Sequence, residues 1–103
     1  YSEDVADWVI TAMKKAPPCI PINIGNGKGI SIKKIAEIIT SRMNPKPKIK
    51  WDSMKPSGDP KRLLDLNRAK DLIGFHPKTS IELGIEKTIE WYKENKSSII
   101  NWK

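Results

Sequence analysis

The chain has 103 residues, of which 38% are hydrophobic and 30% are charged, so residues 1–103 suffice for one small domain and not for several. It contains no apolar run of the roughly 18 residues that span a membrane and no segment that resembles a signal peptide. Its one cysteine, Cys19, can form neither an internal disulfide nor a structural zinc site, so we expect a soluble, cytoplasmic domain.

The first predicted helix begins at the start of the chain. Ser2, Glu3 and Asp4 can cap it, apolar side chains follow at helical spacing, and Pro17 ends it. A natural chain would begin with Met and some lead-in before such a cap. We therefore expect these residues to be a fragment of a longer protein.

A strand, a turn and a second helix are predicted next. Residues 20–24 have the pattern of a short strand, and the glycine-rich residues 25–29 that of a tight turn. Ser31 can cap a helix of apolar periodicity that closes at Asn44.

The second half predicts another strand and two more helices. Residues 48–51 alternate like a half-buried strand, and the Pro- and Gly-containing residues 52–62 form a loop. A short helix has Gly74 at its C-terminal cap, and Thr79 with Glu82 makes a capping box for the last helix. The expected fold class is α/β, with about four helices around two short strands. Because two strands make a poor sheet alone, this fold indicates a missing partner.

Two patterns resemble catalytic or cofactor motifs. Residues 25–29 follow a predicted strand, but Ile30 stands where a dinucleotide fingerprint needs glycine, so a turn with positive φ is the better interpretation. Tyr92 and Lys96 have the Tyr-x-x-x-Lys spacing of short-chain dehydrogenases. Tyr92 lies on the apolar stripe of the last helix, so the match is interpreted as accidental.

Positive charge is concentrated in residues 45–62. They carry six basic and two acidic residues, whereas the whole chain has 19 basic and 12 acidic residues and a net charge of +7. Lys55, Lys61 and Arg62, constrained by proline and glycine, could converge on a diphosphate, with the Arg fork and the Lys point charges as ligands. A solvated basic loop remains the alternative from these residues alone.

Several segments resemble, in the same order, the C-terminal part of the NAD-dependent epimerase/dehydratase family, the extended short-chain dehydrogenases that act on nucleotide sugars. The segments are Tyr1-Ser-Glu-Asp-Val-Ala6, Asn23-Ile-Gly25, Ser31-Ile-Lys-Lys-Ile-Ala-Glu37, Lys55-Pro-Ser-Gly-Asp-Pro-Lys-Arg-Leu-Leu-Asp65, Ala69-Lys-Asp-Leu-Ile-Gly-Phe-His-Pro77, Thr79-Ser-Ile-Glu-Leu-Gly84 and Thr88-Ile-Glu-Trp-Tyr92. The fourth segment is most similar to an epimerase/reductase branch of that family.

The resemblance implies a division of labour within a longer protein. An N-terminal Rossmann domain, absent from this chain, would bind NAD or NADP and carry the catalytic Ser/Thr, Tyr and Lys. This chain would be the smaller domain that closes over a nucleotide-diphosphate sugar, and it would be inactive alone. The parent protein could be a homodimer. Which of epimerisation, reduction or dehydration occurs is decided outside these residues.

The resemblance also implies roles for particular residues. Lys55 and Arg62 match basic positions that contact the substrate diphosphate in relatives, and Lys61 is a possible substitute in the same loop. Asp59 would brace the loop. Asp4 matches the helix-opening acidic position, which we expect to cap the helix and could also shape the sugar pocket.

Two other classes of function remain open from the sequence. A free-standing basic module could bind nucleic acid or another anionic partner through residues 45–62, although no RNA- or DNA-binding signature accompanies the charge. A dimerisation piece is the third hypothesis, because an exposed Trp91 or Trp102 could mark an interface.

Overall fold

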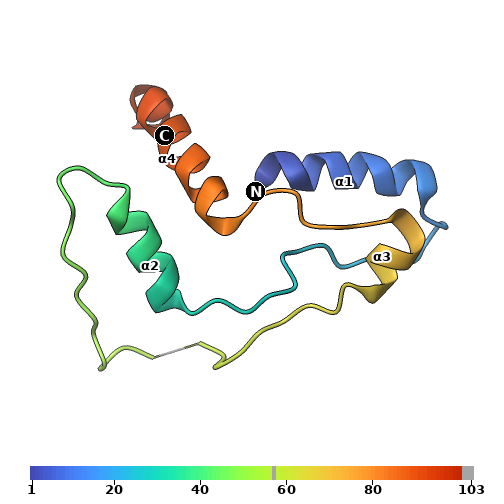
Figure 1. Ribbon diagram of the computed structural model, residues 1–103, viewed down its shortest axis with the longest axis horizontal. Helices are drawn as coiled ribbons and strands as arrows, with labels where there is room; N and C mark the ends of the chain where they lie inside the picture. The colour runs from blue at the N-terminus through green and yellow to red at the C-terminus, as the bar shows by residue number, and fades with distance from the viewer. Residues whose placement is uncertain (57, 101–103) are drawn as a thin grey trace. The chain divides into compact units, whose positions relative to one another are not determined.

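The computed structural model describes residues 1–56 and 58–100. It contains four helices, drawn in Figure 1: α1 (Ser2–Lys15), α2 (Ile32–Ser41), α3 (Asn67–Ile73) and α4 (Ile81–Ile100). The helices belong to two compact units. The first unit combines Tyr1–Ile30 with Asp52–Thr79 and holds α1 and α3, and the second combines Ser31–Trp51 with the segment from Ser80 and holds α2 and α4.

The predicted α/β fold is wrong, because the described residues are helical and contain no strand. The segments 20–24 and 48–51 both lack helical structure, but they fall in different units. A strand exists only when a neighbouring backbone completes its hydrogen-bond ladder. Ile22 and Ile24 are half-buried while Ile20, Pro21 and Asn23 are exposed, so this segment turns two side chains inward without forming a ladder.

The first unit has its core where α1 crosses α3. Trp8 of α1 is only 7% exposed and packs against Phe75, with ring centroids 5.0 Å apart in an edge-to-face arrangement. The buried cluster consists of Trp8, Leu66, Ala69, Ile73 and Phe75. Ile22 and Ile24 pack against it from the segment that follows α1. Burial of these side chains supplies most of the stability of the unit.

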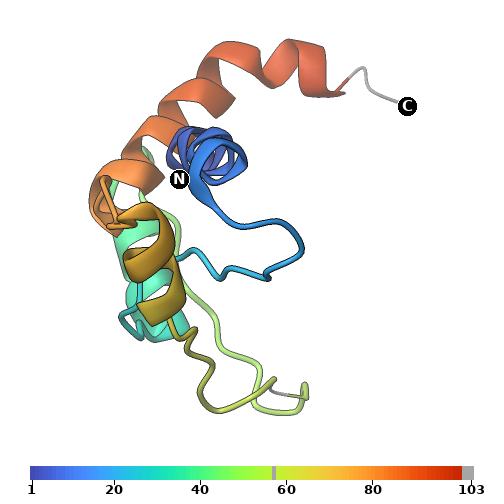
Figure 2. The ribbon, with the colours of Figure 1, turned by 90° about the vertical axis from the view of Figure 1, so that its right-hand side faces the viewer.

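The second unit is built from α2 and α4, which pack against each other (Figure 2). Ile38 is the buried apolar side chain of α2, and Arg42 forms an ion pair with Glu86 at 3.6 Å. The predicted half-buried strand at residues 48–51 is exposed instead: Trp51 is 57% exposed and Ile49 is 38% exposed.

The ends of the helices follow the expected signals in two cases. The Ser31 hydroxyl accepts a hydrogen bond of 3.1 Å from the backbone N–H of Lys34, which confirms it as the cap of α2. Gly74 ends α3 in the left-handed conformation, with φ of 70°. The N–H of Phe75 donates to the carbonyl of Ala69 at 3.2 Å, which satisfies an open carbonyl at the end of that helix.

The predicted capping box of the last helix is wrong by one residue. α4 begins at Ile81, and the Ser80 hydroxyl accepts the hydrogen bond from the backbone N–H of Leu83 at 3.2 Å. The Thr79 hydroxyl donates to Asp4 instead, and Ser80 provides the cap.

None of the helices in the described ranges combines the length and the apolar character that a membrane-crossing segment needs. Trp102, which the sequence analysis considered for an interface, lies outside the described residues, and Trp91 of α4 is 55% exposed.

Candidate diphosphate-binding site

The four residues predicted to bind substrate all belong to the first unit. Lys55, Lys61 and Arg62 lie between Asp52 and Leu66, and Asp4 lies in the first turn of α1. The three basic residues are exposed, and Asp4 is half-buried.

A local turn holds the backbone beside Lys55. The Asp52 carboxylate accepts a hydrogen bond from the N–H of Met54 at 3.0 Å, and the Asp52 carbonyl accepts one from the N–H of Lys55 at 3.3 Å. An Asp side chain that binds backbone two residues on is a common way to fix a tight turn. The turn sets the direction in which the chain leaves residue 55, while the Lys55 ammonium stays in solvent.

The Arg62 side chain forms an ion pair within its own segment. Its guanidinium donates to the Asp59 carboxylate, three residues earlier, in a close ion pair. The Arg62 side chain is 82% exposed and that of Asp59 is 61% exposed, so the pair contributes little to folding stability. The contact uses one guanidinium nitrogen, Nη2, and a guanidinium has five N–H donors in a fixed fork. The remaining donors face solvent and can bind an anion.

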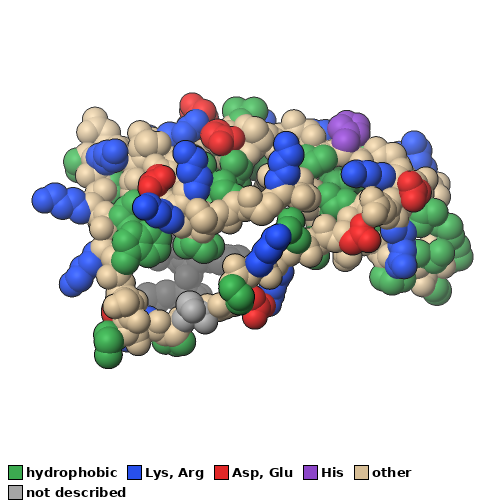
Figure 3. Space-filling model, turned by 60° about the horizontal axis from the view of Figure 1, so that its bottom comes forward, with side chains coloured by type: hydrophobic (Ala, Val, Ile, Leu, Met, Phe, Trp, Pro, Cys, Tyr) green, Lys and Arg blue, Asp and Glu red, His purple; other side chains and the backbone are tan. Residues whose placement is uncertain are grey.

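Lys and Arg side chains stand out from the surface in the space-filling view, with hydrophobic side chains exposed among them (Figure 3). Such hydrophobic side chains in the segment that carries Lys55 and Arg62 include Met54, which is 90% exposed, and Leu63 and Leu64, which are 45% and 47% exposed. The described residues of this segment are therefore accessible to a ligand.

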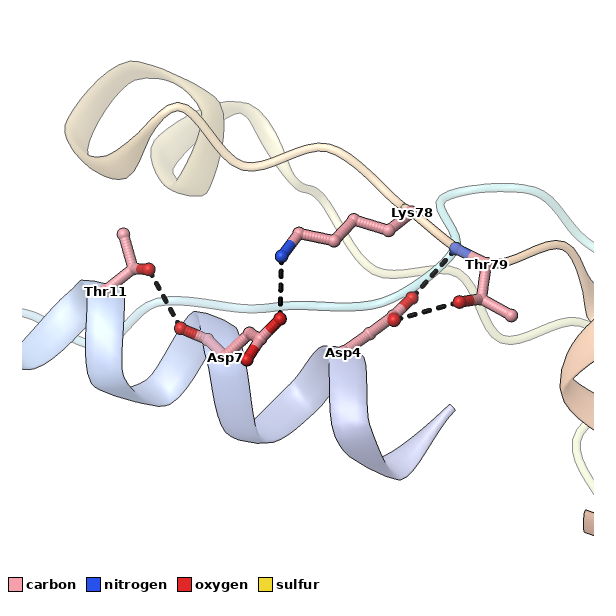
Figure 4. A network of polar contacts seen from close by, with 5 residues as sticks. All are labelled: Asp4, Asp7, Thr11, Lys78 and Thr79. Carbon is pink, nitrogen blue, oxygen red and sulfur yellow. Dashed lines mark hydrogen bonds and ion pairs between the residues drawn. The ribbon is translucent and has the colours of Figure 1, made fainter. Parts of the chain in front are cut away.

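Asp4 does not cap its own helix, which corrects the sequence prediction. Tyr1 is the N-cap of α1, and no side chain makes the capping hydrogen bond. The Asp4 carboxylate instead accepts two hydrogen bonds from Thr79, one from the backbone N–H at 2.8 Å and one from the hydroxyl at 2.9 Å (Figure 4). Asp4 thus ties the start of the chain to a segment 75 residues away.

The environment of Asp4 lowers the pKa of its carboxyl group. Partial desolvation opposes ionisation and is the largest single influence, but the two hydrogen bonds from Thr79 and the positive charges of the N-terminal ammonium and of Lys78 together outweigh it. The carboxylate is therefore ionised at neutral pH. Its oxygens are already engaged by Thr79, which gives Asp4 a structural role.

The neighbourhood of Asp4 contains contacts that the sequence analysis missed. Lys78 donates to the Asp7 carboxylate at 2.8 Å and lies 5.3 Å from the centre of the Trp8 ring (Figure 4 shows the Asp7 contact). His76 lies edge-on to Trp8 with ring centroids 5.3 Å apart, and it is exposed. These pairs join residues about 70 positions apart, so no local sequence pattern could have indicated them.

The glycine turn packs against the core of the first unit. A Cβ placed on Gly27 would lie 2.8 Å from Cδ1 of Leu66, so a leucine side chain lies directly against this glycine. Gly27 has φ of 71°, which confirms the prediction of positive φ in this turn. In the described part of the chain, no group of His, Cys, Asp and Glu side chains could hold a metal ion.

The second unit has a hollow of about 510 Å³ that is open to solvent. Its lining residues are Glu37, Thr40, Lys46, Pro47, Lys48 and Ile49. None of the four predicted substrate-binding residues lines it. Tyr92 and Lys96, whose Tyr-x-x-x-Lys spacing is interpreted above as an accidental match, both lie on α4. The Tyr92 side chain is 47% exposed.

Known proteins similar to this chain include several that are named as enzymes acting on nucleotide sugars. It is 39% identical over 95 residues to the GDP-L-fucose synthase of Sinorhizobium fredii, and 34% identical over 95 residues to the probable GDP-L-fucose synthase 1 of Oryza sativa subsp. japonica. It is also 34% identical over 96 residues to the UDP-glucuronate 4-epimerase of Thermodesulfobacterium geofontis. Each alignment covers 92% of this chain.

The chain belongs to the NAD-dependent epimerase/dehydratase family. This confirms the family resemblance that the ordered segments indicated. The chain spans about three tenths of the length of these relatives: 30% of the Sinorhizobium protein and 29% of the other two. No protein-family model matches the chain, and no solved structure matches it.

Within the family, similarity to the GDP-L-fucose synthases agrees with the epimerase/reductase branch suggested by the segment from Lys55 to Asp65. That segment contains three of the four candidate site residues. The fourth, Asp4, is part of the N-terminal segment that also resembles the family.

Proposed function

We propose that this chain is the part of an NAD(P)-dependent sugar epimerase, dehydratase or reductase that binds a nucleotide-diphosphate sugar, and that the protein is similar to GDP-L-fucose synthase. Support comes from the names of its relatives, which include enzymes for GDP-, UDP- and dTDP-linked sugars. A diphosphate between nucleoside and sugar is the group these ligands share. Basic side chains that bind a diphosphate would serve any of them.

Arg62 would be the principal diphosphate ligand. Its planar fork can bind two phosphate oxygens at once, whereas the ammonium groups of Lys55 and Lys61 would act as point charges. Asp59 would hold the guanidinium in place before the ligand arrives. Asp4 would contribute indirectly, by fixing the segment around Thr79, and its direct participation in a sugar pocket stays a prediction.

The observation that carries the proposal is the exposure of the Arg62 guanidinium together with its ion pair to Asp59. The guanidinium is largely exposed and oriented by Asp59, and four residues later the chain enters the core at the 7% exposed Leu66. An oriented cation on an anchored segment loses little conformational freedom when it binds an anion. Binding energy from the diphosphate would then orient the sugar for chemistry elsewhere in the protein.

The chemistry would be supplied by groups outside these residues. We propose that the complete protein uses NAD or NADP to move a hydride to or from the sugar, as the family resemblance implies. The 103 residues alone would bind the nucleotide sugar without turning it over. Their own task is to bind and orient.

The test compares Arg62→Ala with Arg42→Ala in the complete protein. Both variants remove one guanidinium and one ion pair, but Arg42 pairs with Glu86 in the second unit. We expect Arg62→Ala to cost about 2 kcal/mol of ligand binding, which is a rise of roughly 30-fold in the KM for the nucleotide sugar. Arg42→Ala should leave that KM unchanged, and both variants should bind NAD(P) normally.

An unchanged KM in Arg62→Ala would refute the proposed site. Salt-sensitive binding of oligonucleotides by a protein indifferent to GDP, UDP and dTDP would instead support the alternative of a basic nucleic-acid-binding module.

A further inference from the structure

The glycine turn and the segment that follows Arg62 pack closely against each other. A Cβ on Gly25 would lie 3.3 Å from Cδ1 of Leu64, and one on Gly27 would lie 2.8 Å from Cδ1 of Leu66. The first distance is tighter than almost all real Cβ contacts, and the second requires a neighbour to move. Leu66 is buried in the core, so its side chain has little room to give way. Because Gly25 and Gly27 have no side chains, Leu64 and Leu66 can pack this close to the turn.

Polar contacts join the same two segments further along. The guanidinium of Arg68 donates to the carbonyl of Pro21 at 2.8 Å, and the side-chain amide of Asn23 donates to the carbonyl of Asp65 at 3.4 Å. Residues 21, 23 and 25 thus contact residues 68, 65 and 64 in turn. The two segments lie side by side and run in opposite directions, held by side chains.

This packing fixes the base of the basic segment. Leu63 follows Arg62 directly, and the next residues run through Leu66 into α3. Leu64 and Leu66 lie two and four residues after Arg62 in the same segment. The contacts of these leucines with the glycine turn are therefore close along the chain to the guanidinium.

We propose that Gly25 and Gly27 are positioning residues for diphosphate binding: the turn is the platform on which Leu64 and Leu66 rest, and this contact places Arg62 and Lys61 toward the ligand. The inference rests on the proposed function, since it names the groups that aim the same site. It assigns to the turn a role distinct from contact with a cofactor. Neither glycine touches the ligand itself.

The chain contains controls that separate close contact from backbone strain. Gly25 has the close contact without a positive φ, and Gly27 has both the contact and a φ of 71°. Gly74 has a φ of 70° but nothing within 4 Å of its added Cβ, and it lies in the same unit at the end of α3. An alanine at each position therefore tests contact, contact with strain, and strain alone.

The experiment is a calorimetric titration of GDP into the complete protein and its Gly25→Ala, Gly27→Ala, Gly74→Ala and Arg62→Ala variants, with a thermal melt of each. We expect the Kd for GDP to rise about tenfold in Gly27→Ala and about threefold in Gly25→Ala. The reason is that a small displacement of the Arg62 guanidinium weakens its hydrogen bonds to the diphosphate. Gly74→Ala should lower the melting temperature and leave the Kd within twofold of the wild type. Gly25→Ala decides the question if Gly27→Ala does not fold.

A compensating change adds a readout that lost stability would not produce. Leu66→Val removes the Cδ1 atom that an added Cβ on Gly27 would meet. In the double variant of Gly27→Ala with Leu66→Val, the Kd should return toward the wild-type value although a core methylene has been lost.

The outcomes of the two proposals differ. If Arg62→Ala weakens GDP binding while Gly25→Ala and Gly27→Ala do not, the platform is refuted and the proposed function stands. If Gly74→Ala weakens binding as much as Gly27→Ala does, strain rather than contact is responsible and the platform is also refuted. If Arg62→Ala has no effect on GDP binding, the proposed function itself fails.

Discussion

The indole of Trp8 offers a quantitative test of the core of the first unit. Its ring is buried to 7% exposure between α1 and α3 and packs edge-on against Phe75 and His76. Its indole N–H is buried and has no hydrogen-bond partner within the described part of the chain. The ring and the N–H therefore have opposite effects on stability, and two substitutions can separate them.

Trp8→Ala removes the ring and leaves a cavity. Truncation of a buried aromatic residue to alanine costs about 3–5 kcal/mol of unfolding free energy. Trp8→Phe keeps an aromatic ring for the edge-to-face contact with Phe75 but removes the N–H. The smaller ring loses roughly 1 kcal/mol of packing, and removing an unpaired buried donor recovers about 1–3 kcal/mol. We therefore expect Trp8→Phe to be at least as stable as the wild type, by up to about 2 kcal/mol.

Urea unfolding of the complete protein and the two variants, followed by circular dichroism, measures both numbers. The midpoint of Trp8→Phe should be equal to or higher than that of the wild type, and the midpoint of Trp8→Ala much lower. If Trp8→Phe were as destabilising as Trp8→Ala, the indole N–H would have to be stabilising, and the account of this core would be wrong.

Two further predictions concern local contacts. The pKa of Asp4 is lowered in the folded state, so its charge stabilises the fold above about pH 4, the ordinary carboxyl value, and that contribution is lost as the pH falls through the lower folded pKa. The stability difference between wild type and Asp4→Asn in urea unfolding should therefore be constant from neutral pH to about pH 5 and shrink below pH 4; a difference independent of pH would contradict the role of Thr79. Ser31→Ala should destabilise α2 by about 1 kcal/mol, because the Ser31 hydroxyl caps the helix by accepting from the backbone N–H of Lys34. Ser31→Asp should retain most of that stability. Equal melting temperatures for wild type and Ser31→Ala would contradict the cap.

The sequence predicted the helices well because their signals are local. The cap at Ser31, the terminator at Gly74 and the break before Pro17 are each decided by backbone within a few residues. The strands were predicted from an equally local alternation, but a ladder also requires a second backbone at the right distance. Residues 20–24 contact the rest of the first unit through side chains and form no backbone hydrogen-bond ladder with another segment. The prediction of a strand was therefore wrong there.

The candidate site shows the same division between local and distant contacts. The chemistry of Lys55 and Arg62 could be predicted from residue type, and the brace from Asp59 lies only three residues away. The hydrogen bonds from Thr79 to Asp4, 75 residues apart, could not be predicted from residue type. Contacts between segments far apart in sequence are set by the packing of the whole unit.

The central claim is that Arg62 and its lysine neighbours bind a diphosphate, and the most direct measurement is a calorimetric comparison of GDP with GMP. The complete protein should bind GDP at least about tenfold more tightly than GMP, since the second phosphate adds charge-assisted hydrogen bonds. In Arg62→Ala that preference should largely disappear, with GMP affinity little changed. Equal affinities of the wild type for GDP and GMP would contradict the account.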